Sequence, residues 1–216
     1  MNISTIFFDL DDTLYPASSG LWAVIRQRIG MYMHSRLNIP ADEASALQVS
    51  LFQQYGTALR GLQARYDVDT AEYLAFVHDV PLQQYISPDV VLQQTLAGLP
   101  ARKFIFTNGD IQHARRVLQV LQIEQYFDGI IDITAITPYC KPMPQSFDIA
   151  LNLAGETDPR RCVLIDDLPR TISAARQLGM FSILFGSSPA QADADATLLD
   201  WASLPGLLDG RNHEHG

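Results

Sequence analysis

The chain has 216 residues, which is enough for one sizeable core and a second small lobe. Hydrophobic residues make up 47% of it and charged residues 18%, ordinary values for a globular protein. The net charge of −9 argues against a nucleic-acid polymer as partner, because binding to a phosphate backbone depends on Lys and Arg.

The N-terminal segment has no basic stretch, and no apolar run approaches the roughly 20 residues of a membrane helix. We therefore expect no signal peptide, no membrane partner and a cytoplasmic location. The two cysteines, Cys140 and Cys162, lack metal-ligand spacing, and we expect both to be reduced thiols. The last six residues, 211–216, are polar, and we expect a flexible tail there.

Short apolar runs, most of them ending in a polar cluster, predict buried parallel strands. In chain order they cover residues 5–8, 103–106, 129–133, 162–165 and 181–185. Between them, apolar residues at helical spacing predict helices over residues 111–121, 146–153 and 171–178. Strands that alternate with helices indicate an α/β fold, a Rossmann-like doubly wound parallel sheet.

The segment 16–87 differs, because it contains no convincing strand and has helical periodicity throughout. We expect helices near 21–32, 41–54 and 70–78. A block of this length is too long for an ordinary crossover connection. The sequence thus predicts a core of residues 1–15 and 88–210, with residues 16–87 inserted as a small α-helical cap.

Four polar clusters lie where predicted strands end or shortly after, and the carboxyl ends of parallel strands are where such sheets place their ligands. Several carboxylates that converge require a cation, and Mg²⁺ is the hard cation suited to phosphate chemistry. Hydroxyl, amide and ammonium groups beside it are suited to holding phosphoryl oxygens. The clusters are Asp9 with Asp11, Thr107 with Asn108, Lys141, and Asp166 with Asp167.

Each cluster alone also has an ordinary structural interpretation. An acidic pair is often a solvated loop, Thr107 fits a turn or helix cap, and Lys141 fits a surface lysine. The recurrence of such clusters along one predicted sheet favours a single site.

The segment Phe7-Phe8-Asp9-Leu10-Asp11-Asp12-Thr13 resembles the DxDxT signature of the haloacid dehalogenase superfamily. Thr107 is similar to the second motif of that superfamily, Lys141 to the third and Asp166-Asp167 to the fourth. Order and spacing fit along essentially the whole chain. An aspartate two residues after the nucleophile marks the phosphatases and mutases of the superfamily, whereas the dehalogenases proper lack it.

The resemblance implies roles for these residues. Asp9 would attack phosphorus to form an aspartyl-phosphate, and Asp11 would act as general acid and then general base. Mg²⁺ would be held by the Asp9 carboxylate, the Asp11 backbone carbonyl and Asp167, with Asp166 reaching it through water. The phosphoryl oxygens would be held by Thr107, Asn108 and Lys141.

The cap also resembles the pyrimidine 5′-nucleotidase branch, in Tyr55-Gly56-Thr57-Ala58-Leu59-Arg60-Gly61-Leu62 and His78-Asp79-Val80-Pro81. This implies a nucleoside monophosphate as the small phosphorylated partner, with Tyr55, Arg60 and His78 as candidate substrate contacts. Each of the three also has an ordinary structural interpretation: Tyr55 as a core-packing residue, Arg60 as a solvated arginine, and His78 as a helix-end residue favoured by the helix dipole.

Other functions remain open at this point. The same chemistry suits a sugar phosphate or another small phosphomonoester, because the reacting centre is identical. A non-enzymatic phospho-receiver also combines carboxylates, Thr and Lys on a parallel sheet, but its acidic pair comes first in the chain. A catalytically dead phosphatase kept as a binding protein is a further alternative, although none of the four motifs is missing.

Overall fold

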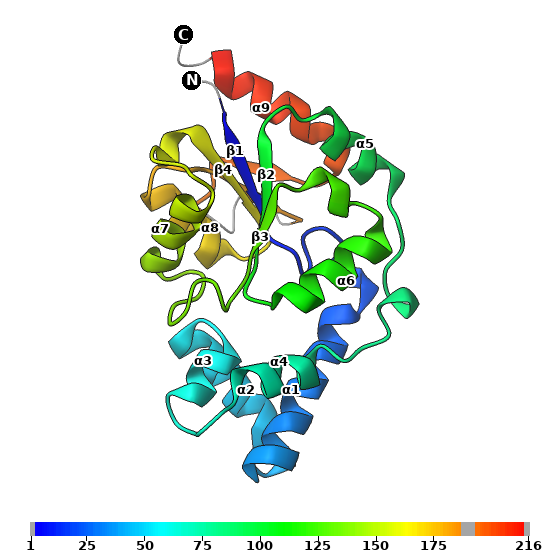
Figure 1. Cartoon of the computed structure of the whole chain (residues 1–216), viewed down its shortest axis with the longest axis vertical. Coiled ribbons are helices and arrows are strands. Elements are labelled where there is room, and N and C mark those ends of the chain that lie inside the picture. The colour runs from blue at the N-terminus through cyan, green and yellow to red at the C-terminus, as the bar shows by residue number, and fades with distance from the viewer. Residues whose placement is uncertain (1–2, 187–192, 214–216) are drawn as a thin grey trace.

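The computed structural model describes residues 3–186 and 193–213 of the chain. Within these residues, six parallel strands form one sheet in the order β3-β2-β1-β4-β5-β6 (Figure 1). The sequence predicts five of them and does not predict β6, whose residues Ala-Thr-Leu form no apolar run. The strands are β1 (Thr5–Phe8), β2 (Arg102–Phe106), β3 (Gly129–Ile131), β4 (Cys162–Asp166), β5 (Phe181–Phe185) and β6 (Ala196–Leu198).

Helices cover both faces of the sheet, as the alternation of strands and helices predicts (Figure 1). Successive strand residues point to opposite faces, so Phe7 packs in the cluster that includes α7 and α8, whereas Phe8 belongs to the cluster with α5, α6 and α9. These helices are α5 (Val90–Gly98), α6 (Ile111–Leu121), α7 (Pro144–Leu153), α8 (Pro169–Gln177) and α9 (Leu204–His213). The predicted α/β class is therefore confirmed.

Four helices of the segment 16–87, which we call the cap, lie together beyond one end of the sheet, away from the two termini (Figure 1). Side-chain oxygens start two of them: Thr57 accepts from Arg60 N, and Asp69 accepts from Glu72 N. The short helix α3 is not predicted by the sequence. The cap helices are α1 (Leu21–Leu37), α2 (Ala41–Tyr55), α3 (Ala58–Gln63) and α4 (Thr70–Val77).

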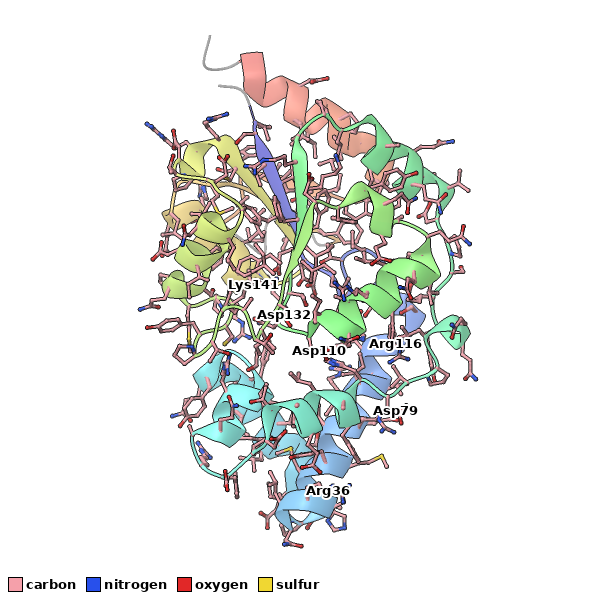
Figure 2. The ribbon with its side chains drawn as sticks, viewed as in Figure 1. Arg36, Asp79, Asp110, Arg116, Asp132 and Lys141 are labelled. Carbon is pink, nitrogen blue, oxygen red and sulfur yellow. The ribbon has the colours of Figure 1, made fainter. Side chains whose placement is uncertain are left out.

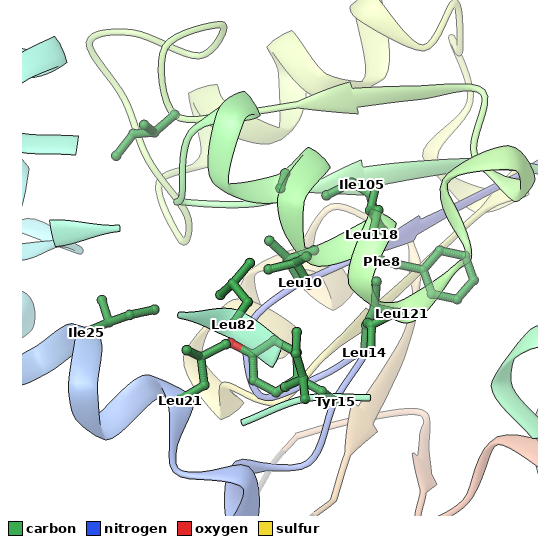
Figure 3. Packing of buried hydrophobic residues seen from close by; sticks show 14 of the residues in the cluster. Phe8, Leu10, Leu14, Tyr15, Leu21, Ile25, Leu82, Ile105, Leu118 and Leu121 are labelled. Carbon is green, nitrogen blue, oxygen red and sulfur yellow. The ribbon is translucent and has the colours of Figure 1, made fainter. Parts of the chain in front are cut away.

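The core and the cap share one apolar cluster (Figure 3). It begins at Phe8 on β1, continues through Leu10 and Leu14 in the following loop, and reaches Leu21 and Ile25 on α1. All five side chains are at most 2% exposed. Burial of this kind stabilises by about 1.5–3 kcal/mol per large side chain, so the loop that carries the first acidic motif is firmly packed.

Short 3₁₀ helices lie at Ala17–Ser19, Leu82–Gln84, Glu124–Tyr126, Pro159–Arg161 and Trp201–Ser203. In the described part of the chain, no helix is long and apolar enough to cross a membrane. Cys140 and Cys162 are both buried and free. Helix α9 includes residues 211–213, which the sequence assigns to a tail, and the tail residues 214–216 lie outside the described residues.

Candidate active site

Strand register brings the first and last acidic motifs together. Phe8 at the end of β1 pairs with Ile105 on β2 and with Ile165 on β4. The next residue, Asp9, donates its backbone N–H to the Ile165 carbonyl at 2.9 Å and so stands beside Asp166. The two motifs are separated by more than 150 residues in sequence and meet because their strands are adjacent and parallel.

Lys141 joins these two carboxylates. Its Nζ lies 2.7 Å from Asp9 Oδ1 and 2.7 Å from Asp166 Oδ2, and its side chain is 3% exposed. Burial alone would lower the pKa of Lys141, but the charges of Asp166 and Asp9 outweigh it and raise the pKa above the ordinary value. The lysine is therefore a fixed buried cation at the centre of the site.

Burial dominates the electrostatics of the nucleophile candidate. It raises the pKa of Asp9 to about 7, against the opposing effect of the Lys141 charge. The Asp9 Oδ2 atom accepts a hydrogen bond from Thr13 Oγ1 at 3.2 Å, which braces the carboxylate. Thr13 is fully buried, so its hydroxyl links the loop after β1 to the Asp9 carboxylate.

Three carboxylates form a set that fits a divalent cation. Asp9, Asp166 and Asp167 each place one oxygen within 4.8 Å of the others. Burial, followed by the charges of Asp166 and Asp9, raises the pKa of Asp167 to about 9. Such mutual repulsion is relieved by a hard cation with oxygen ligands, so the donor set fits Mg²⁺. Asp166 has both oxygens in use, on Lys141 and on the Leu168 backbone N–H.

The second motif has a different geometry from the one expected for Asn108. Its side-chain amide donates to the Lys141 carbonyl at 3.0 Å and accepts from the Lys141 N–H at 2.9 Å. The Asn108 side chain thus fixes the loop that carries Lys141. The Thr107 hydroxyl is buried and accepts from the Gly109 backbone N–H at 2.9 Å.

Asp11 is held by one of its two oxygens. Its Oδ1 atom accepts from the Tyr15 hydroxyl at 2.6 Å and lies 2.8 Å from His113 Nε2. Burial tends to raise the pKa of Asp11, but the charge and hydrogen bond of His113 outweigh it, and the pKa lies below the ordinary value.

The three cap residues are placed differently from one another. Tyr55 packs against the main apolar cluster, with the Arg65 guanidinium 5.7 Å from its ring centroid. His78 is buried and its Nδ1 lies 2.5 Å from Asp110 Oδ2. The Arg60 guanidinium reaches the core, where Nη2 donates to the Ile133 and Tyr139 carbonyls at 2.9 and 3.0 Å.

Two arginines of the core donate hydrogen bonds to backbone carbonyls of the cap, the reverse of the Arg60 contact. Arg116 on α6 donates to the His78 and Val80 carbonyls at 2.8 and 2.6 Å. Arg170 on α8 donates to the Phe52 and Gly56 carbonyls at 2.9 and 2.7 Å. Figure 2 shows Lys141, Asp110 and Arg116 along the edge of the core that faces the cap. Arg60, Arg116 and Arg170 together form what we call the arginine clasp.

Sequence reasoning does not find Tyr15, Asp110 or His113 as parts of the site. The spacing of each residue from a recognised motif is the feature that could have identified it. Tyr15 follows Asp11 by four residues, so both reach the same side of the tight turn after β1. Asp110 caps α6 by accepting from the N–H groups of Gln112 and His113, which places His113 in the first turn beside the motif.

The fold and the acidic site define the class of protein, and the comparisons with known proteins agree with it. The model of the haloacid dehalogenase-like hydrolases matches residues 3–179. The chain therefore belongs to the haloacid dehalogenase-like hydrolase family, as its motifs predict.

Sequence identity to individual relatives is low. The chain is 31% identical over 192 residues to Phosphate metabolism protein 8 of Saccharomyces cerevisiae, a match that covers 82% of this chain and only 60% of that protein. It is 27% identical over 201 residues to validoxylamine A 7′-phosphate phosphatase of Streptomyces hygroscopicus subsp. limoneus, covering 89% and 90%. The crystal structure of the putative HAD-hydrolase YfnB from Bacillus subtilis, described as bound to magnesium, has the same fold, with a TM-score of 0.65 at 16% identity over 97% of this chain and 100% of that one.

Proposed function

We propose that the protein is a Mg²⁺-dependent phosphomonoester hydrolase that works through an aspartyl-phosphate on Asp9. The observation that carries the proposal is the convergence of two carboxylates with distinct environments. Asp9 is bound to the Lys141 ammonium, whereas Asp11 is bound to the neighbouring His113 and Tyr15. Without a cation, burial raises the pKa of Asp9 to about 7, and a divalent cation beside it would favour the ionised form that a nucleophile needs. Tyr15 and His113 hold the Asp11 carboxyl group in place for proton transfer.

The chemistry follows from these positions. Asp9 attacks phosphorus, the bond between phosphorus and the ester oxygen breaks, and Asp11 gives its proton to the leaving oxygen. Asp11 then takes a proton from the water that attacks the aspartyl-phosphate, which releases inorganic phosphate and frees Asp9. Lys141 and the Thr107 hydroxyl stabilise charge on the phosphoryl oxygens, while Asn108 keeps the Lys141 loop in place.

The cation belongs beside the nucleophile. Asp9, the Asp11 backbone carbonyl and Asp167 would hold Mg²⁺, and Asp166, whose oxygens also bind Lys141 and the Leu168 N–H, would act through water as the family resemblance implies. When bound, the ion supplies charge neutralisation for an anionic phosphate approaching an acidic site.

The substrate we propose is a nucleoside 5′-monophosphate, with preference for pyrimidines, in the cytoplasm. Its support is the resemblance of the cap segments around Tyr55 and His78 to the pyrimidine 5′-nucleotidase branch. One observation favours a second candidate, a sugar phosphate or other small phosphomonoester: a relative matched over 90% of its length is named for a substrate that is not a nucleotide.

Phosphate release from a panel of esters separates these candidates. UMP, CMP, purine nucleotides and sugar phosphates are compared at neutral pH with Mg²⁺. The proposal expects UMP and CMP to have the highest kcat/KM, and a sugar phosphate in that place would replace the nucleotidase assignment with the second candidate. Absence of turnover for every ester would refute the phosphatase assignment itself.

A further inference from the structure

The general acid proposed above is part of a larger polar network that extends into the cap. We propose that His113 and Tyr15 are positioning residues that direct the reactive proton of Asp11, and that cap residue His78 holds His113 in place. This inference rests on the proposed phosphatase function and adds residues that its motifs do not include.

The first step concerns the two oxygens of Asp11. Both donors, the Tyr15 hydroxyl and His113 Nε2, bind Oδ1. An oxygen that accepts two hydrogen bonds has its lone pairs engaged, so a proton on the carboxyl group resides on Oδ2. A methyl group built on Gly109 would lie 3.7 Å from this Oδ2 atom and 3.3 Å from Thr107 Oγ1, so Oδ2 and the hydroxyl of the proposed phosphate contact Thr107 both border Gly109.

The second step concerns what holds His113. Its side chain is fully buried, and its backbone N–H donates to Asp110 Oδ1. The other oxygen of Asp110 binds His78 Nδ1. The rings of His78 and His113 are stacked, with centroids 4.1 Å apart and planes inclined by 11°. His113 is thus fixed through its backbone by Asp110 and through its ring face by His78.

The third step concerns the origin of His78. It is the residue that ends cap helix α4, and Arg116 on the core binds its carbonyl. The stack therefore exists only when the cap lies against the core as it does here. A cap that moves away removes one face of the His113 pocket, so the acid is fully aligned only when bulk water is excluded.

Leaving-group dependence tests the positioning role. A dinitrophenolate leaves without protonation, whereas an alkoxide needs the acid, so loss of proton placement lowers kcat/KM, which reports the steps up to departure of the leaving group, only for alkyl esters. We compare kcat/KM for 2,4-dinitrophenyl phosphate and an alkyl phosphate in Tyr15→Phe, His113→Leu and His113→Gln. Gln retains a donor in place of Nε2, and His34→Gln on α1, remote from the site, serves as control.

The expected result is selective. For the alkyl ester, kcat/KM falls about 10–100-fold in His113→Leu and about 5–10-fold in Tyr15→Phe. These losses are part of the roughly 10²–10⁴-fold rate increase that a general acid contributes. Both variants retain kcat/KM for dinitrophenyl phosphate within about threefold, and His113→Gln recovers most of the kcat/KM for the alkyl ester. His78→Leu gives a smaller loss of the same kind.

Equal losses on both esters would overturn the inference and leave a structural role. If His113→Leu does not fold, the comparison of the two esters in Tyr15→Phe tests the inference, because this substitution removes one hydroxyl and keeps the ring. Failure of the proposed function has a different signature, namely no turnover of either ester by the unmodified protein.

Discussion

The Lys141 ammonium lies 2.7 Å from the Asp9 carboxylate, in a position where both side chains are almost fully buried. The same ammonium contacts Asp166 at 2.7 Å, so one cation serves the nucleophile and the acidic pair. A buried charge that loses its partner is costly, which makes this contact important for stability as well as for chemistry.

Replacement of Lys141 separates the two contributions. We expect Lys141→Met to lower kcat/KM about 10²–10³-fold, because a fixed donor to the phosphoryl oxygens is lost. The metal-free variant should also lose about 3 kcal/mol of unfolding free energy, since Asp9 and Asp166 are left unpaired. Steady-state kinetics and urea unfolding measure the two effects.

The control for this change is the other lysine of the chain, Lys103. It is also buried, and its Nζ donates to the Leu99 and Ala101 carbonyls, at the far end of β2 from the site. Lys103→Met should cost stability but keep turnover within about twofold. A comparable loss of turnover in both variants would mean that Lys141 acts only through folding.

Asp167 makes the stability of the metal-free protein depend on pH. Its pKa is about 9 in the folded state and 3.8 for an ordinary aspartate, so between these pH values the folded state binds a proton that the unfolded state does not. The unfolding free energy contributed by this group is therefore highest below pH 4 and is lost as pH rises through about 9. The shift of Asp9 to about 7 acts in the same direction.

We expect the Tm of the metal-free protein to fall between pH 6 and pH 9 and Mg²⁺ to restore it. Asp167→Asn carries no charge, so it should be more stable than wild type at pH 8 by about 1 kcal/mol, or about 2–4 °C in Tm, with little response to Mg²⁺. The exposed Asp148→Asn serves as control. A Tm that rises with pH in the absence of metal would contradict the assignment.

Gly109 leaves little room between the motifs. A methyl group there would lie 3.3 Å from Thr107 Oγ1 and 3.4 Å from His113 Cδ2. We expect Gly109→Ala to lower kcat about tenfold while changing unfolding free energy by less than about 1 kcal/mol, because small misplacements at a reacting centre are costly. Gly98→Ala on α5 meets nothing within 4 Å and should keep full activity. Unchanged kcat in Gly109→Ala would show that the motif tolerates displacement.

Arg60 tests whether the arginine clasp positions the cap or contacts the substrate. In the structure its guanidinium is occupied by core carbonyls, so Arg60→Gln should lower kcat/KM by a similar factor, about tenfold, for every ester. Hydrogen exchange should also rise in residues 133–139. Arg65→Gln on the same cap, where the Arg65 guanidinium donates to the Gln54 side chain and lies 5.7 Å from the Tyr55 ring centroid, is the control. A loss confined to nucleotides would restore Arg60 as a substrate contact.

The sheet and the convergence of the four motifs are predictable because they depend on short-range signals. A run such as residues 5–8 identifies a strand, and parallel strands align their carboxyl ends at one edge. The family assignment follows from the same motifs. The paths of individual side chains are less predictable, as Asn108 illustrates: its sequence position fits a phosphate donor, but its amide binds the backbone of Lys141.

The network from Asp11 to His78 is not predictable from a single sequence. It depends on the placement of α4 against α6, a contact between segments that are adjacent only in the folded chain. Nothing in the local pattern of His78 or His113 distinguishes a stacked pair from two unrelated helix residues. Similarly, the carbonyls that receive Arg60 and Arg170 are backbone groups without any residue signature.

The central claim is that Asp9 carries the phosphoryl group. In Asp11→Asn the general base is absent, so the aspartyl-phosphate should accumulate when a good leaving group such as 2,4-dinitrophenolate removes the need for the acid. The measurement is mass spectrometry of the acid-quenched variant after mixing with 2,4-dinitrophenyl phosphate and Mg²⁺. We predict one phosphoryl group on the peptide that contains Asp9, and none when Asp9→Asn is added. A phosphoryl group on any other residue, or substantial turnover by Asp9→Asn, would contradict the mechanism.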